Sequence, residues 1–104
     1  MRFASTFVES LPADIRSGNQ SRLVEDACYS LVNPTTVSAP KMLAYSRDLC
    51  EQLGIPIDWI QSDEATNVLS GNQLLGGMKP YAMCYGGHQF GNWAGQLGDG
   101  RAIN

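Results

Sequence analysis

Residues 86–101 of this chain have the sequence Gly86-Gly-His-Gln-Phe-Gly-Asn-Trp-Ala-Gly-Gln-Leu-Gly-Asp-Gly-Arg101. They belong to a glycine-rich region, because nine of the eleven glycines of the chain lie between Gly71 and Gly100. Glycine loses more backbone entropy on folding than other residues, so this density is costly unless the backbone turns tightly or approaches another group closely. The intervening residues form no repeat and are not serine-rich, which argues against a flexible linker.

The two most familiar phosphate-binding motifs are absent from this region. Gly86 and Gly91 have the outer spacing of a Walker A loop, but Asn92-Trp93 stand where its lysine and hydroxyl residue belong. Gly98-Asp99-Gly100 begins like a dinucleotide-binding turn, but Ile103 occupies the place of the last glycine. The region therefore belongs to neither motif class.

Gly98, Gly100 and Arg101 nevertheless meet the chemical requirement of a phosphate cradle. Backbone N–H groups can converge on anionic oxygens where no side chains obstruct them, and the two glycines leave that space. Arg101 adds a permanent positive charge and a forked set of donors that suits phosphate. However, Gly98-Asp99-Gly100 is also a strong signal for the turn of a β-hairpin, with Asp99 as a turn residue. Spacing alone supports a nucleotide cradle and a plain hairpin equally, and the two are compatible.

Strands are predicted on both sides of the glycine-rich loop. Residues 80–85 are aromatic at their ends and apolar between, and residues 101–103 resemble the start of a further strand. Residues 80–104 are therefore expected to form a strand, the glycine-rich loop and a second strand. Because this second strand lacks partners in the sequence, we expect the chain to be a truncated part of a longer protein. Its exposed apolar surface is expected to promote self-association.

Residues 1–79 are expected to form a mainly helical extension. The clearest helix is predicted over residues 41–53, with Ser38 as its cap and Pro40 in its first turn. Gly54 suits the left-handed conformation that ends a helix. The apolar stripe of this helix is expected to form a core rather than a binding site.

A second, shorter helix is predicted to begin after Ser62 or Asp63 and to stop at Gly71. Its acidic first turn is favoured by the helix dipole. Residues 22–32 carry both a helical and a strand pattern, so their structure stays undecided. Residues 33–40 are expected to be an extended linker, because the residue before a proline avoids the helical conformation.

Composition limits the classes of partner and compartment. The 104 residues suffice for one domain, and a hydrophobic fraction of 43% is ordinary for a globular chain. The net charge is −3 and the seven basic residues are scattered, which argues against nucleic acid as a partner. No apolar stretch is long enough to span a membrane or to serve as a secretory signal. Three cysteines without a CxxC pair argue against a disulfide framework or a zinc site and favour a cytoplasmic protein with reduced thiols.

The other polar and aromatic residues of the glycine-rich region are assigned structural roles. His88 is the only histidine and lacks the partners that catalysis or metal binding needs, so a hydrogen-bonding role is expected. Gln89 and Gln96 are expected to order the loop through their amides. Phe90 and Trp93 are expected to pack beneath the loop, since large aromatic residues anchor cores more often than ligands.

Residues 85–102 resemble the signature of the selenoprotein O family, the pseudokinase protein adenylyltransferases. Looser similarity at residues 27–35 and 44–53 extends the resemblance over most of the chain. The resemblance implies an α+β fold, in which a helical extension precedes the first strands and the glycine-rich loop of a protein-kinase-like N-lobe. Residues 1–104 would then be the N-terminal part of a single kinase-like domain.

The same resemblance implies transfer of AMP from ATP to the hydroxyl groups of Ser, Thr or Tyr in proteins, with Mg²⁺. Gly98, Gly100 and Arg101 match ATP-contacting positions of the family. The family's catalytic and metal-binding residues have no match in this sequence, so they are expected outside the chain. The chain alone is then expected to be inactive. The alternative is a non-catalytic binding or scaffolding module in which the glycine region forms a compact hairpin.

Overall fold

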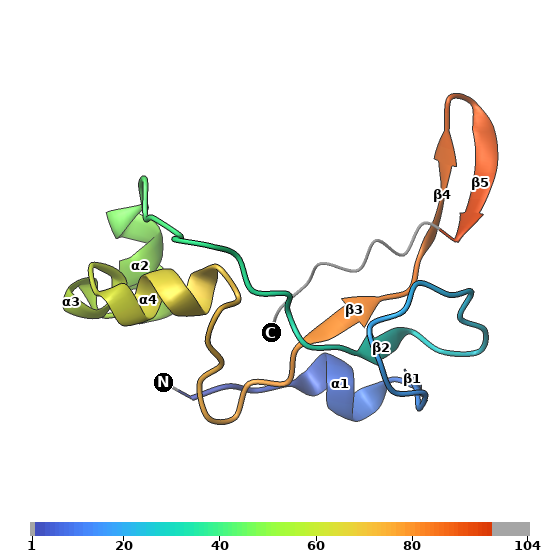
Figure 1. The fold of residues 1–104 in the computed structure, drawn as a ribbon, viewed down its shortest axis with the longest axis horizontal. Helices are drawn as coiled ribbons and strands as arrows, with labels where there is room; N and C mark the ends of the chain where they lie inside the picture. Colours follow the sequence, from blue (N-terminus) through green and yellow to red (C-terminus); the bar gives the residue numbers. More distant parts are fainter. Residues whose placement is uncertain (1, 97–104) are drawn as a thin grey trace. The chain divides into compact units, whose positions relative to one another are not determined.

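The computed structural model describes residues 2–96. It divides into two units, Met1–Pro34 with Gly77–Asn104, and Thr35–Gly76. Both helices and strands occur and all are short (Figure 1), which confirms the α+β class. The kinase-like arrangement stays a prediction. The longest helices within residues 2–96 have seven residues, too few to cross a lipid bilayer.

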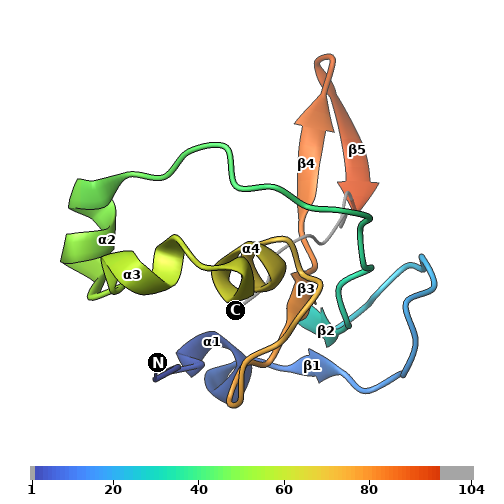
Figure 2. The ribbon, with the colours of Figure 1, turned by 60° about the vertical axis from the view of Figure 1, so that its left-hand side comes forward.

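The first unit contains a three-stranded sheet. Strand β1 (Ala13–Asp14) runs parallel to β2 (Tyr29–Leu31), which pairs antiparallel with β3 (Tyr81–Met83). The predicted strand at 80–85 is thereby confirmed, and the undecided segment 22–32 contains a strand rather than a helix. Figure 2 shows the three strands side by side, with helix α1 (Thr6–Ser10) leading into β1.

Three aromatic rings hold α1 against this sheet. Phe7 stacks on Tyr81 at a centroid distance of 5.0 Å and is tilted against Tyr29 at 5.7 Å. The hydroxyl of Tyr29 donates a hydrogen bond to the carbonyl of Val8 at 2.6 Å. Both tyrosines are buried. A five-residue helix is too short to be stable in isolation, so these tertiary contacts account for α1, which the sequence did not predict.

Most of the glycine-rich region that the structure describes is a β-hairpin. Strands β4 (Gly86–Gln89) and β5 (Asn92–Gln96) are antiparallel. The turn between them is Phe90-Gly91, with φ of 51° and 80°, the positive values that a two-residue type I′ turn requires. Residues 86–96 of the predicted glycine-rich loop are therefore a hairpin in the structure. The predicted turn at 98–100 and the predicted strand at 101–103 lie outside the described residues.

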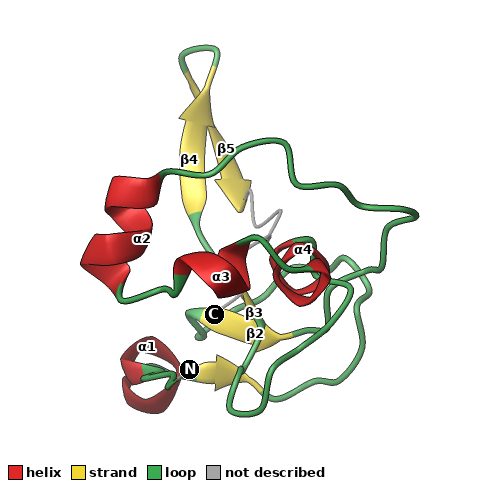
Figure 3. Ribbon diagram, turned by 90° about the vertical axis from the view of Figure 1, so that its left-hand side faces the viewer, coloured by secondary structure: helices red, strands yellow, loops and turns green. Residues whose placement is uncertain are grey.

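The second unit consists of three short helices, α2 (Arg47–Leu53), α3 (Ile57–Ile60) and α4 (Asp63–Leu69), which Figure 3 shows in red. Its core contains one buried residue from each helix, namely Cys50, Ile60 and Ala65. Partly buried apolar side chains pack against these three, among them Met42 and Trp59.

The predicted helix over 41–53 is confirmed at its end and wrong at its start. Gly54 has φ of 67° and ends α2 in the left-handed conformation. However, α2 begins at Arg47, where the hydroxyl of Ser46 accepts a hydrogen bond from the N–H of Leu49 at 3.2 Å. The cap is therefore Ser46 and not Ser38, because a hydroxyl caps only a helix whose first free N–H groups it can reach.

The second predicted helix is confirmed as α4. Ser62 caps it by accepting a hydrogen bond from the N–H of Ala65 at 3.1 Å, and Asp63 and Glu64 occupy its first turn. Helix α3 was not predicted. It begins directly after Pro56, and Glu64 accepts a hydrogen bond of 2.6 Å from the indole of Trp59, which ties α3 to α4.

Candidate functional site

The residues predicted to contact a nucleotide, Gly98, Gly100 and Arg101, lie outside the described residues. The structure describes the chain that leads to them. Strand β5 ends at Gln96, and only Leu97 separates this residue from Gly98. Gln96 is therefore the last described residue before the predicted loop.

Gln96 is anchored by both ends of its side-chain amide. Its Oε1 accepts a hydrogen bond from the backbone N–H of Val24 at 2.7 Å. Its Nε2 donates to the carbonyl of Arg22 at 3.2 Å. Gln96 was expected to order the glycine-rich loop through its amide, and both ends of that amide are hydrogen-bonded to residues 22–24. Because one planar amide satisfies a donor and an acceptor of the same segment, the end of β5 is tied to residues 22–24.

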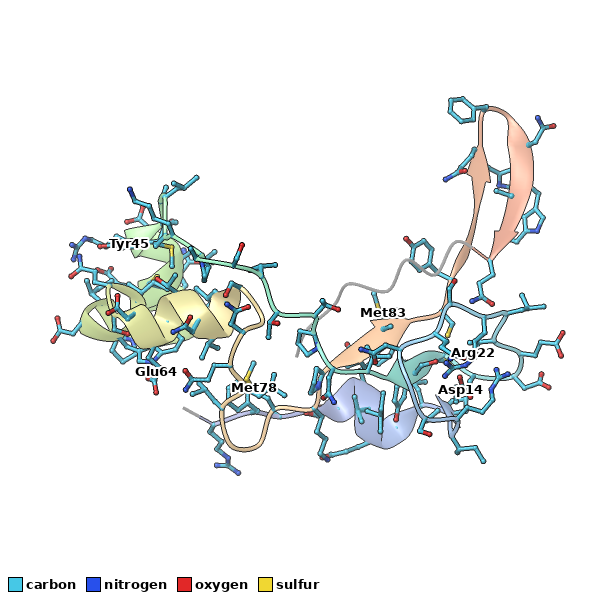
Figure 4. The ribbon with its side chains drawn as sticks, viewed as in Figure 1. Asp14, Arg22, Tyr45, Glu64, Met78 and Met83 are labelled. Carbon is cyan, nitrogen blue, oxygen red and sulfur yellow. The ribbon has the colours of Figure 1, made fainter. Side chains whose placement is uncertain are left out.

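The side chain of Arg22 fixes that segment in turn. Its Nε and Nη2 donate to Oδ2 of Asp14 at 3.0 and 2.6 Å. Its guanidinium also donates to the carbonyls of Gln20 at 3.1 Å and Arg16 at 3.2 Å. Only 19% of the Arg22 side chain is exposed. Figure 4 labels Arg22 and Asp14 next to each other in the first unit.

Asp14 is the buried centre of this cluster. Its side chain is 5% exposed, and it accepts hydrogen bonds from the hydroxyl of Ser30 at 3.0 Å and from both the N–H and Nε of Arg16 at 3.1 and 3.0 Å. Burial acts to raise the pKa of Asp14, but the hydrogen bonds from Arg22, Arg16 and Ser30 outweigh it and hold the pKa well below its ordinary value. The carboxylate therefore stays ionised and paired.

The contacts of Asp14 and Arg22 suit them to fixing the backbone of residues 16–22 and not to acid–base chemistry. The carboxylate of Asp14 is occupied by donors of the protein itself, and a general base needs a pKa near neutrality and room for a substrate proton. Asp14 and Arg22 were not predicted to have a role. An aspartate and two nearby arginines have no fixed spacing when they pair, so no sequence pattern reports such a cluster.

The aromatic residues of the hairpin do not follow the prediction. The side chain of Phe90 is fully exposed at the turn, so its predicted packing beneath the loop is wrong. Trp93 is 63% exposed and lies against the hairpin itself, where a Cβ added to Gly86 would be only 2.5 Å from the indole ring. The ring of His88 meets Trp93 edge-on at a centroid distance of 5.2 Å.

Metal-binding residues do not gather in the described part of the chain. Within residues 2–96, no group of three or more His, Cys, Asp or Glu side chains is arranged to hold an ion. Cys28, Cys50 and Cys84 are free thiols. The expectation that Mg²⁺ ligands lie outside this chain stays a prediction.

Comparison with known proteins identifies the family. The family model described as protein adenylyltransferase SelO matches residues 16–104, a range that includes Gln96, Gly98, Gly100 and Arg101. Over all 104 residues, the chain is 56% identical to the protein nucleotidyltransferase YdiU of Rhodopirellula baltica and 53% identical to that of Methylobacillus flagellatus. It spans 19% and 20% of the length of these relatives. The chain therefore belongs to the SelO family of protein adenylyltransferases.

Proposed function

We propose that this chain is the N-terminal part of an enzyme that transfers AMP from ATP to hydroxyl side chains of proteins. The observation that carries this proposal is the extent of the family match, which runs to residue 104 and includes the whole Gly98–Arg101 stretch. Relatives that cover the entire chain are named protein nucleotidyltransferases, which supports nucleotidyl transfer as the reaction class. The choice of AMP, ATP and Mg²⁺ goes beyond those names and is part of the proposal.

The reaction replaces one bond to phosphorus by another. The hydroxyl oxygen of a Ser, Thr or Tyr side chain attacks the α-phosphorus of ATP, and the bond from that phosphorus to the bridging oxygen breaks. Pyrophosphate leaves, and the proton of the hydroxyl passes to a base that we place outside this chain. Because charge builds up on the phosphate oxygens, catalysis depends mainly on positioning and on electrostatic stabilisation.

In this proposal Gly98 and Gly100 let the backbone approach the phosphates, since neither carries a side chain that would obstruct the N–H groups. Arg101 supplies a permanent positive charge and two parallel donors to the phosphate oxygens. Mg²⁺ would neutralise further charge on the phosphates, through ligands outside this chain. The chain alone is then expected to bind a part of the nucleotide at most and to transfer nothing.

Two labels on ATP test this function in the full-length parent protein. With the label on the α-phosphate, we expect protein-bound radioactivity and release of unlabelled pyrophosphate. With the label on the γ-phosphate, we expect none on protein. Labelling from the γ-position would mean phosphoryl transfer and would contradict the proposal. The isolated chain is expected to give no label from either position, and turnover by it would contradict the placement of the catalytic groups elsewhere.

A further inference from the structure

We propose that Gln96, Arg22 and Asp14 are positioning residues for the glycine-rich nucleotide loop. In this proposal they do not contact ATP. They fix the position from which the loop starts. The inference rests on the proposed function, because it concerns the loop that carries Gly98, Gly100 and Arg101.

The anchored residue Gln96 lies close to the predicted loop along the chain. Gln96 is held through its backbone in the β4–β5 pairing, where it lies opposite Gly86. It is also held through its side chain by the backbone of Arg22 and Val24. Only Leu97 separates Gln96 from Gly98 in the sequence, so the anchored residue directly precedes the predicted loop.

The segment that binds the amide of Gln96, residues 22–24, is itself fixed. If residues 22–24 moved freely, the amide of Gln96 would restrain nothing. Arg22 prevents this through the 2.6 Å ion pair with Asp14 and through its bonds to carbonyls of the preceding turn. Asp14 belongs to β1 and lies opposite Ser30 of β2, whose hydroxyl it binds. An unbroken set of contacts therefore connects the sheet to the start of the loop.

An anchored start of the loop is expected to strengthen the binding of ATP. A glycine-rich loop has many accessible backbone conformations, and ATP must select the few that point its N–H groups at phosphate. An anchored start removes some of this freedom before ATP binds, and such preorganisation strengthens binding. Loss of the anchor is therefore expected to raise KM for ATP, while the site for the protein substrate is unaffected.

Gln96→Glu is the sharpest variant for a test in the full-length parent. The carboxylate keeps the acceptor that faces the N–H of Val24 but replaces the donor that faces the carbonyl of Arg22 by a second acceptor. The chain offers a matched control in Asn72. Its amide accepts from the N–H of Val37 at 2.7 Å and donates to the carbonyl of the same residue at 2.8 Å, in the other unit. Asn72→Asp makes the same chemical change there.

Steady-state kinetics with ATP and with the protein substrate, together with the melting temperature, separate positioning from folding. Gln96→Glu is expected to raise KM for ATP about tenfold, with KM for the protein substrate and the melting temperature close to those of the parent. Arg22→Lys, which keeps the charge but loses the fork that binds Asp14 and the carbonyls, is expected to shift KM for ATP in the same direction. Asn72→Asp is expected to leave KM for ATP unchanged.

Three outcomes would overturn the inference. If Gln96→Glu and Asn72→Asp raised KM for ATP equally, the cause would be a general loss of structure and not the loss of the anchor. An unchanged KM for ATP in Gln96→Glu, combined with a raised KM for ATP in Arg101→Ala, would contradict the positioning role of Gln96 but agree with the proposed function. An unchanged KM for ATP in both Gln96→Glu and Arg101→Ala would contradict the nucleotide loop, and the inference with it.

Discussion

The side-chain amide of Gln96 accepts a 2.7 Å hydrogen bond from the backbone N–H of Val24, across 72 residues of sequence. The contact joins the end of the glycine-rich hairpin to a loop near the N-terminus. Closing such a long loop costs conformational entropy, so the bond is sustained by the structure around it. That structure includes the sheet of β1, β2 and β3 and the buried cluster around Asp14.

The first prediction concerns the pH dependence of stability. The pKa of Asp14 is lower in the folded chain than in the unfolded chain, where it is about 3.9. The contribution of Asp14 to stability is therefore complete above the unfolded pKa and is lost as the pH falls toward the folded one. In urea unfolding between about pH 5 and pH 2, Asp14→Asn is expected to lose less stability on acidification than the wild type.

A second variant checks the cause of that shift. Arg22→Gln removes the main donor to Asp14, so the pKa of the carboxyl is expected to rise and the loss of stability to begin at a higher pH. If Asp14→Asn and the wild type lost stability in parallel across the acidic range, the paired and buried state of Asp14 would be contradicted.

The second prediction concerns helix caps. Ser46→Ala and Ser62→Ala each remove a hydroxyl that accepts a hydrogen bond from a helix N–H, so each is expected to lower the free energy of unfolding by about 1 kcal/mol. Ser38→Ala is the matched control, because α2 begins well after it. Trp59 fluorescence in a Trp93→Phe background reports on these helices alone, since the chain has two tryptophans. A larger loss of unfolding free energy for Ser38→Ala than for Ser46→Ala would contradict the start of α2 at Arg47 and favour the longer predicted helix.

The third prediction separates two exposed glycines in the same unit. Gly54 and Gly76 both have open space where a Cβ would lie, but only Gly54 has a positive φ, of 67°. Gly54→Ala is expected to cost about 1–2 kcal/mol, because an L side chain is strained in the left-handed conformation. Gly76→Ala is expected to be neutral or to stabilise by up to about 1 kcal/mol, through reduced freedom of the unfolded chain. Urea unfolding of both variants measures the difference, and equal effects would contradict the left-handed end of α2.

Local signals in the sequence were sufficient for part of this fold. Gly54 and Ser62 mark the end of α2 and the start of α4, because both act on groups within one turn of themselves. The strand β3 was predicted from its aromatic and apolar residues. The start of α2 was predicted wrongly, because Ser38 followed by Pro40 is a typical helix start, whereas Ser46 caps the helix in the structure.

Features that depend on distant contacts escaped prediction. Helix α1 is held by rings from two strands, and the cluster of Asp14 and Arg22 has no periodicity. The turn at Phe90-Gly91 was missed because phenylalanine rarely adopts a positive φ, and Asp99-Gly100 offered a stronger turn signal. A hydrogen-bonding role was expected for the amide of Gln96, but its partners in residues 22–24 were not foreseen. A cytoplasmic location and self-association stay predictions.

The most direct test of the central claim is the affinity of the full-length parent for ATP after Arg101→Ala, measured by calorimetry and accompanied by the rate of α-phosphate transfer. Arg47→Ala, at an exposed position of α2, is the matched loss of one positive charge. We expect Arg101→Ala to weaken ATP binding at least tenfold and to slow transfer strongly, while Arg47→Ala changes neither. Unchanged ATP affinity and unchanged transfer in Arg101→Ala would contradict the assignment of residues 98–101 to the phosphates of ATP.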